Sequence, residues 1–148
     1  MLKEMLQTVN LHLKRAGATY QDIQKINFET EVFTSDENVK TIDAFIYRFV
    51  KLQDYMGDKL FKELLRSLLE YKDNMSMLDV LSKLEKLEII PSEDRWLDYR
   101  EVRNKLTHEY PDNENDILDG IKISLVYFSE IKENIKHIES YISEHGLS

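Results

Sequence analysis

Apolar residues recur every three or four positions in several stretches of the chain, which is the spacing of an amphipathic α-helix. The first stretch predicts a helix from about Met1 to Ala16, with Gly17 as its C-terminal stop. Residues 19–34 carry a weaker pattern, which predicts at most one helical turn near residues 21–26. The apolar positions of the first helix are Leu2, Met5, Leu6, Val9 and Leu13.

Start signals and breaks mark the next two helical regions. Ser35 precedes an apolar stripe that resumes beyond Gly57, so the pattern allows either two helices or one long helix that the glycine weakens. Ser76 and Asp79 have the spacing of a capping box and open a further helix, which Pro91 is expected to stop. The stripe around Gly57 contains Val39, Ile42, Phe45, Ile46, Phe49, Val50, Leu60, Phe61, Leu64, Leu65, Leu68 and Leu69.

Two more helices are predicted in the last third of the chain. Ser92 is expected to cap a helix from Glu93 to about Glu109, because Pro111 disfavours helical geometry at the residue before it. A long final helix follows and ends before Gly146. The whole pattern predicts an all-α fold, an up-and-down bundle of four to five antiparallel helices in a single domain over residues 1–148.

Composition and charge narrow the class of protein. The chain has 148 residues, enough for one buried core, and it contains no cysteine, so disulfides and thiolate metal sites are excluded. The N-terminal segment is too charged for a signal peptide and no apolar run is long enough to span a membrane, so we expect a cytoplasmic protein without a membrane partner. A formal net charge of -8 argues against a general nucleic-acid-binding surface, although one local basic patch or a basic partner would still permit RNA binding.

Most enzyme signatures are absent from the sequence. There is no glycine-rich phosphate loop, no Gly-x-Ser-x-Gly turn and no pair of histidines at metal-binding helical spacing, so neither a metal nor a cofactor is expected. His12, His137 and His145 lie among polar helix positions and are expected at the surface.

One segment, residues 103–110, brings together side chains suited to phosphodiester chemistry. The guanidinium of Arg103 can hold a phosphate with two hydrogen bonds, and the imidazole of His108 can move a proton near neutral pH. On a regular helix these two residues lie about 140° apart, so they converge only if the helix end unwinds or if two chains face each other. A structural alternative is that His108 caps the helix and Arg103 pairs with a nearby glutamate.

The order Arg103, four residues, His108, one residue, Tyr110 resembles the defining motif of HepT-like HEPN ribonuclease toxins, and Arg103 with Asn104 matches the Arg-Asn doublet of that family. The similarity covers about residues 38–139. It implies a HEPN-like helical bundle that forms a homodimer, in which two motifs face each other across a cleft and form a metal-independent endoribonuclease site.

The resemblance also implies residue roles. Arg103 and His108 would be the catalytic pair, with Asn104 as polar support, and the ribose 2′-hydroxyl would attack to leave a cyclic phosphate. The cognate antitoxin would be a minimal nucleotidyltransferase that attaches AMP to Tyr110, where the added bulk and negative charge would repel RNA.

Arg100 and Lys105, together with Arg95, are candidates for the local basic patch that contacts RNA, although they are equally well explained as solvated charges balanced by neighbouring acids. Dimerisation is also expected from aromatic residues that a small bundle does not fully bury, namely Trp96, Tyr99, Tyr127 and Phe128.

Two alternative functions stay open. The chain could be a non-catalytic partner or substrate-binding subunit of a nucleotidyltransferase, which the acidic net charge fits slightly better. It could also be a structural bundle without activity, in which case Arg103 and His108 would be dispensable.

Overall fold

The computed structural model describes residues 1–29, 32–108 and 114–148, without the side chain of His108. The described residues form helices and no strands, which confirms the predicted all-α class. The elements are α1 (Leu2–Ile23), the 3₁₀ turn η1 (Val32–Thr34), α2 (Asp36–Tyr55), the π-helical turn η2 (Met56–Leu60), α3 (Phe61–Ser67), α4 (Met77–Lys86), α5 (Glu93–His108) and α6 (Glu114–Glu144).

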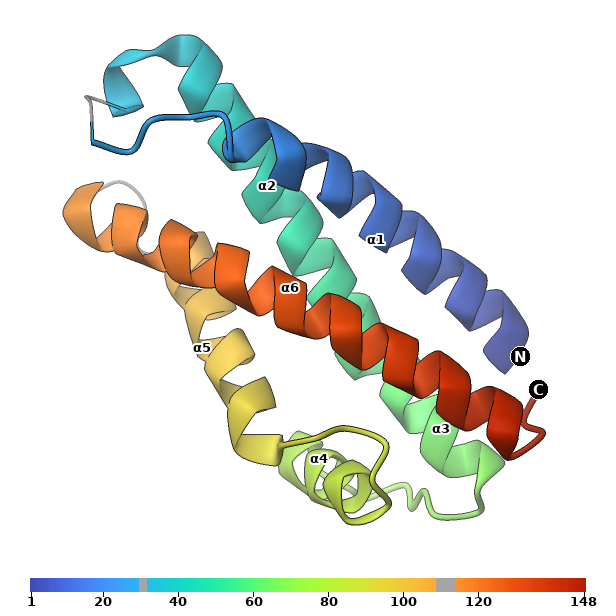
Figure 1. Cartoon of the computed structure of the whole chain (residues 1–148). Helices are drawn as coiled ribbons and strands as arrows, with labels where there is room; N and C mark the ends of the chain where they lie inside the picture. Colours follow the sequence, from blue (N-terminus) through green and yellow to red (C-terminus); the bar gives the residue numbers. More distant parts are fainter. Residues whose placement is uncertain (30–31, 109–113) are drawn as a thin grey trace.

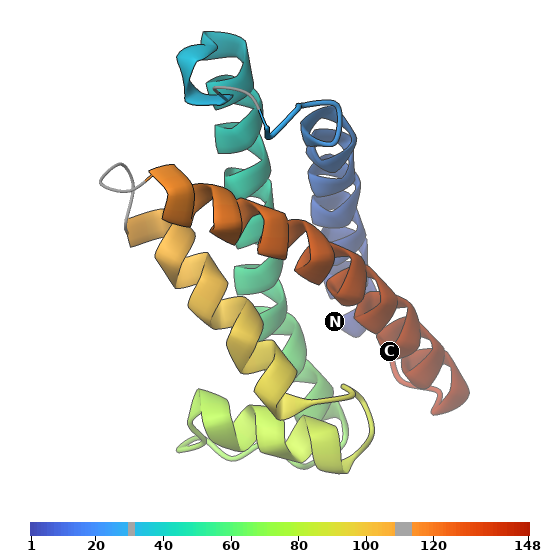
Figure 2. The ribbon, with the colours of Figure 1, turned by 60° about the vertical axis from the view of Figure 1, so that its left-hand side comes forward.

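The long helices alternate in direction along the bundle, as Figures 1 and 2 show. Helix α1 packs against α2, α5 packs against α6, and α2 contacts both α1 and α5. The short α4 lies across one end and contacts α3 and α5. Helix α2 therefore lies between the N-terminal helix and the helix that carries the Arg103 motif.

Helix α1 continues past Gly17 to Ile23, so the predicted stop at Gly17 is wrong. Its fully buried residues are spaced seven apart, at Leu2, Val9, Ala16 and Ile23, so the buried stripe continues through the glycine. Burying a side chain such as Ile23 contributes about 1.5–3 kcal/mol, which exceeds the roughly 1 kcal/mol that a glycine costs inside a helix. Tertiary packing therefore overrides the local stop signal.

Gly57 does not divide the second helical region. Residues 36–67 form one continuous helical path, with the π turn η2 between α2 and α3. Within this turn the N–H of Phe61 donates to the carbonyl of Met56, five residues earlier. Gly57 itself is buried beside Met77 of α4, where an added Cβ would lie 3.5 Å from the terminal methyl carbon.

The predicted helix starts are confirmed. The hydroxyl of Ser35 accepts a hydrogen bond from the N–H of Asn38, Ser76 and Asp79 form both bonds of a capping box, and the Ser92 hydroxyl accepts from the N–H of Arg95.

The predicted stop of α4 at Pro91 is misplaced, because the helix already ends at Lys86. The chain leaves the helix through Glu88, whose φ is 61°, and the N–H of Ile89 donates to the carbonyl of Leu84 at 2.9 Å. This left-handed turn satisfies the terminal carbonyl groups before the proline is reached.

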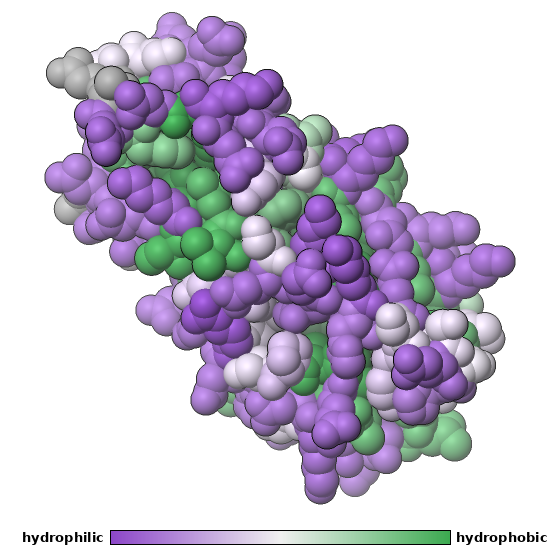
Figure 3. Space-filling model, viewed as in Figure 1, coloured by the Kyte–Doolittle hydropathy of each residue, from purple (hydrophilic) through white to green (hydrophobic). Residues whose placement is uncertain are grey.

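The core encloses most of the aromatic residues that we expected to be incompletely buried. Trp96, Tyr99 and Phe128 are at most 3% exposed, so this argument for dimerisation is wrong for three of the four residues. On α6, apolar exposure occurs instead at Ile123 and Val126, which are 45% and 56% exposed. Figure 3 shows a mainly hydrophilic face with apolar surface between α6 and the α1–α2 pair.

One of the three histidines expected at the surface is partly buried. The ring of His12 lies 5.6 Å from that of Tyr55, and its Nδ1 is buried without a hydrogen-bond partner. Burial lowers the pKa of His12, and Arg15 lowers it further. His137 and His145 are exposed, as expected.

Among the described helices none is long and apolar enough to cross a membrane.

Leu69 provides a test of the turn that ends the α2–α3 path. It has a φ of 60° and is 93% exposed, so it holds a left-handed conformation without gaining burial. We expect Leu69→Gly to raise the free energy of unfolding by about 0.5–1 kcal/mol in urea denaturation, because glycine adopts this conformation without the steric cost of a Cβ. Leu69→Ala is the control and should give no such gain; equal stabilisation by both substitutions would contradict the explanation.

Candidate functional site

Arg103 is fixed by a two-point ion pair to Asp54 on the facing helix. Its Nε donates to Asp54 Oδ1 at 3.1 Å and its Nη2 donates to Asp54 Oδ2 at 2.8 Å. The third nitrogen, Nη1, donates to the side-chain oxygen of Asn104 at 3.2 Å. The hydrogen bonds to Asp54 raise the pKa of Arg103, and the charges of Asp54 and Asp58 raise it further. The guanidinium is therefore permanently charged and held in one orientation.

Sequence reasoning missed Asp54, which lies 49 residues before Arg103. A weak signal exists, because Asp54 continues the row of Ile46 and Val50 at four-residue steps on α2. A carboxylate on that row indicates that the α2 face meets a cation rather than more of the core. The pattern alone does not reveal which cation it meets.

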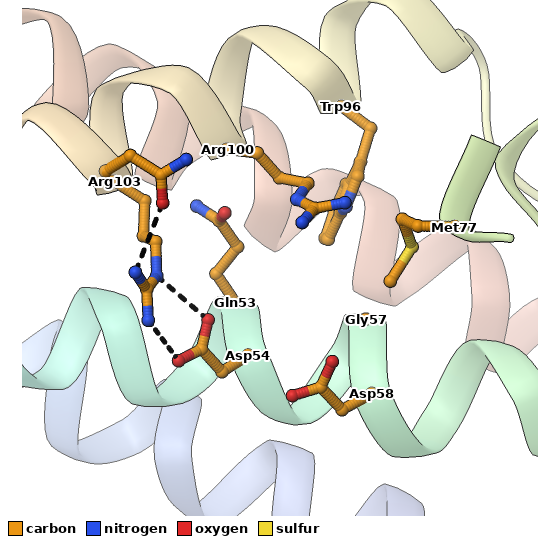
Figure 4. A pocket seen from close by; sticks show the side chains of 9 residues that line it. Gln53, Asp54, Gly57, Asp58, Met77, Trp96, Arg100 and Arg103 are labelled. Carbon is orange, nitrogen blue, oxygen red and sulfur yellow. Dashed lines mark hydrogen bonds and ion pairs between the residues drawn. The ribbon is translucent and has the colours of Figure 1, made fainter.

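The ion pair separates two hollows in the surface between α2 and α5. On one side lies a cavity of about 230 Å³, here called the polar cavity, whose close-up view is Figure 4. Gln53 and Asp54 of α2 and Gly57 and Asp58 of η2 form its lower wall in that view. The opposite wall consists of α5 residues, Trp96, Arg100, Arg103 and Asn104, and Met77 of α4 closes one end.

On the other side of the pair lies a more open groove of about 540 Å³, here called the α2–α5 groove. It includes Tyr47, which is 53% exposed, and Lys51. The guanidinium of Arg48 and the ammonium of Lys51 lie 5.1 Å and 5.5 Å from the centre of the Tyr47 ring. Two cations around an exposed aromatic ring are suited to a nucleic-acid strand, because bases stack on the ring and phosphates meet the cations. Sequence reasoning did not single out these residues.

The three basic residues expected to form one patch on α5 lie in different surroundings. Arg100 lines the polar cavity beside Arg103, but Lys105 lines a separate hollow between α5 and α6 that also contains Asp98 and Glu101. A patch that contains all three is therefore absent from the described part of the chain.

Arg95 is occupied by α6. Its Nε and Nη2 donate to the two carboxylate oxygens of Glu130, each at 2.7 Å, and the Tyr99 hydroxyl donates to the same carboxylate at 2.8 Å. Arg95 also lies over the Tyr127 ring, 4.7 Å from its centre. Hydrogen bonding to Arg95 lowers the pKa of Glu130, while burial and the bond to Glu130 raise that of Tyr99. This cluster joins α5 to α6 rather than offering a free cation to RNA.

The other predicted site residues divide into those that the structure places and those that it does not. Asn104 accepts a hydrogen bond from Arg103, and its role as polar support for a catalytic site stays a prediction. The backbone of α5 is helical through His108, but the side chain of His108, the predicted helix end at about Glu109 and the whole of Tyr110 lie outside the described residues.

Comparison of the chain with models of known protein families and with curated protein sequences found no match. Within residues 1–29, 32–108 and 114–148, no group of three or more His, Asp or Glu side chains is arranged to hold a metal ion.

The Arg103–Asp54 pair should contribute measurably to stability. The two side chains are 25% and 41% exposed, so solvent weakens the attraction, but the two-point geometry strengthens it. We expect a coupling of about 0.5–1 kcal/mol from urea denaturation of Asp54→Asn, Arg103→Gln and the double variant.

A matched cycle on Lys136 and Glu133 provides the control, because this pair has a single contact of 3.3 Å between side chains that are 63% and 71% exposed. Its coupling should be smaller. Equal couplings for the two pairs would show that the two-point geometry adds nothing.

Proposed function

We propose that this chain is the toxin subunit of a HEPN toxin–antitoxin system, a metal-independent endoribonuclease that acts in the cytoplasm and is inactivated by AMPylation of Tyr110. The observation that carries the proposal is the fixed guanidinium of Arg103, with all three nitrogens bonded to Asp54 and Asn104 at the wall of a surface cavity. Donors held in place before the reaction stabilise developing charge without reorganising, which is a large source of rate enhancement.

The guanidinium also keeps hydrogens for a substrate. Asp54 accepts one hydrogen bond from Nε and one from Nη2, and Asn104 accepts one from Nη1. Each Nη nitrogen carries a second hydrogen that none of these bonds uses. These two remaining hydrogens are available to the non-bridging oxygens of a phosphate. Asp54 is thus a positioning residue for Arg103.

The proposed reaction is an internal transesterification of RNA. The 2′-oxygen forms a bond to phosphorus, the bond between phosphorus and the 5′-oxygen breaks, and the upstream fragment keeps a 2′,3′-cyclic phosphate. A base must take the 2′-hydroxyl proton and an acid must protonate the leaving 5′-oxygen. Histidine suits both roles because it titrates near neutral pH.

A homodimer is part of the proposal because one α5 helix does not direct Arg103 and His108 to one point. Helix α5 is unbroken from Glu93 to His108, and a separation of five residues rotates the two positions by about 140°. Two copies related by a twofold axis would supply two His108 side chains and two Arg103 side chains to one cleft.

The proposed partner is a minimal nucleotidyltransferase antitoxin that transfers AMP to Tyr110. Tyr110 follows α5 by two residues, so the added phosphate would lie close to the proposed site along the chain. A negative phosphodiester there would repel RNA and compete for the cations of the site.

RNA cleavage by the purified chain in excess EDTA tests the proposal. We expect the wild type to cut RNA, and His108→Ala and Arg103→Ala to lose about 100-fold or more of the rate, as expected for loss of a proton-transfer group or a charge-stabilising donor. His145→Ala is the matched control, because His145 is exposed just after α6 and its ring contacts only Tyr141 among the described residues, through a hydrogen bond to the carbonyl and stacking of the two rings. The control should cut at the wild-type rate.

Two outcomes would contradict the proposal. Cleavage that survives His108→Ala would indicate a contaminating nuclease. Absence of cleavage by the wild type would favour a non-catalytic partner of a nucleotidyltransferase, which the net charge of -8 and the neutralisation of Arg103 by Asp54 both fit.

A further inference from the structure

The polar cavity offers two sets of hydrogen-bonding groups that the described residues leave unused. Arg100 and Asp58 both line it, and neither forms an ion pair or hydrogen bond with any described residue. Figure 4 shows that Arg100 comes from α5 on one wall and Asp58 from η2 on the other. A cation and a carboxylate therefore face the same space without pairing with each other.

Two side-chain amides beside them are fixed in orientation. The Nε2 of Gln53 donates to the carbonyl of Tyr99 at 3.1 Å, which leaves its Oε1 as an acceptor. The Oδ1 of Asn104 accepts from Arg103 at 3.2 Å, which leaves its Nδ2 as a donor. The α5 wall thus adds a donor to Arg100, and the α2 wall adds an acceptor to Asp58.

A small part of the cavity wall is apolar. Met77 and Trp96 line it together with Gly57, which has no side chain. A planar group can pack against the Met77 thioether and the bare backbone of Gly57, while its edges meet the polar groups. The cavity volume of about 230 Å³ is several times the roughly 30 Å³ that one water molecule occupies in the liquid, so the cavity has room for a group larger than water.

Among the common nucleobases, guanine matches this arrangement best. Its O6 and N7 accept two hydrogen bonds from one arginine, and its N1–H and exocyclic N2–H groups form an adjacent pair of donors that suits a carboxylate. Adenine presents the lone pair of a ring nitrogen to that carboxylate, and cytosine and uracil each offer one donor group next to acceptors. A phosphate between Arg100 and Asp58 would meet the Asp58 carboxylate, which would repel it.

We propose that the polar cavity is a guanine-binding subsite, in which Arg100 binds O6 and N7 and Asp58 accepts from N1 and N2. As a subsite for RNA it rests on the proposed ribonuclease function, and it would place a guanosine next to the phosphate held by Arg103. Binding of a free guanine nucleotide does not depend on that function, so the two proposals fail separately.

Calorimetric titration of the full chain with GMP, AMP, CMP, UMP and inorganic phosphate tests the subsite. We expect GMP to bind at least about tenfold more tightly than the other four, since each two-point contact to a base discriminates by roughly that factor. Trp96 is the single tryptophan and lines the cavity, so its emission should change with GMP at the same concentrations. Equal affinities for the four nucleotides, or tighter binding of phosphate alone, would overturn the proposal.

Substitutions of cavity residues test where GMP binds. Asp58→Asn and Arg100→Gln should each weaken GMP binding about tenfold and remove its advantage over AMP. Asp119→Asn and Arg15→Gln are matched controls at exposed positions outside the described cavity and should bind as the wild type does. Gly57→Ala should fold, because the added Cβ would lie at an ordinary contact distance of 3.5 Å from Met77. It should nevertheless weaken the binding of GMP, because the added methyl group takes up space in the cavity. Weakening by the controls equal to that of the cavity variants would overturn the assignment.

Cleavage maps distinguish a subsite for RNA from a site for free nucleotide. If RNA cuts occur beside guanosines and are lost in an RNA whose guanosines are replaced by adenosines, the subsite belongs to the ribonuclease. GMP binding without any RNA cleavage would support the cavity as a site for the free nucleotide while the ribonuclease proposal fails. Cleavage without guanosine preference, together with no GMP binding, would overturn the subsite alone.

Discussion

The ion pair between Arg103 and Asp54 joins the two helices on which the candidate site depends. Both nitrogen-to-oxygen contacts are short, and they cross from α5 to the C-terminal part of α2, just before the π turn. Asp54 and Arg103 line both the polar cavity and the α2–α5 groove. The pair thus sets the orientation of the guanidinium and the shape of the surface around it.

The π turn explains how one helical path carries both core and site. Helices α2 and α3 bury their apolar rows in the core of the bundle. Where the two helices meet at η2, the polar cavity is lined by Gln53, Asp54, Gly57 and Asp58. π turns are rare and frequently occur at functional sites, because they change the direction of side chains without ending the helix. Gly57 lies in this turn, close to Met77, and the helix continues through it.

The fold was largely predictable from the sequence, because apolar periodicity and capping residues are local signals. The errors at Gly17 and Pro91 share a cause, since in both cases packing or turn geometry elsewhere decided where the helix ended. Of the site, the sequence indicated Arg103, Asn104 and Arg100. It could not indicate Asp54 or Asp58 as their neighbours, because contacts between residues about 40 to 50 positions apart leave no spacing pattern in a single chain.

The end groups of the cleaved RNA test the central claim most directly, which is that the Arg103 site cuts RNA through the ribose 2′-hydroxyl. A synthetic RNA cut by the wild-type chain in EDTA would be analysed by mass spectrometry, beside the same RNA with one 2′-deoxyribose at the cut position. The account predicts a 2′,3′-cyclic phosphate on the upstream fragment, a 5′-hydroxyl on the downstream fragment and no cut at the deoxyribose. A 3′-hydroxyl with a 5′-phosphate, or unchanged cutting at the deoxyribose, would contradict it.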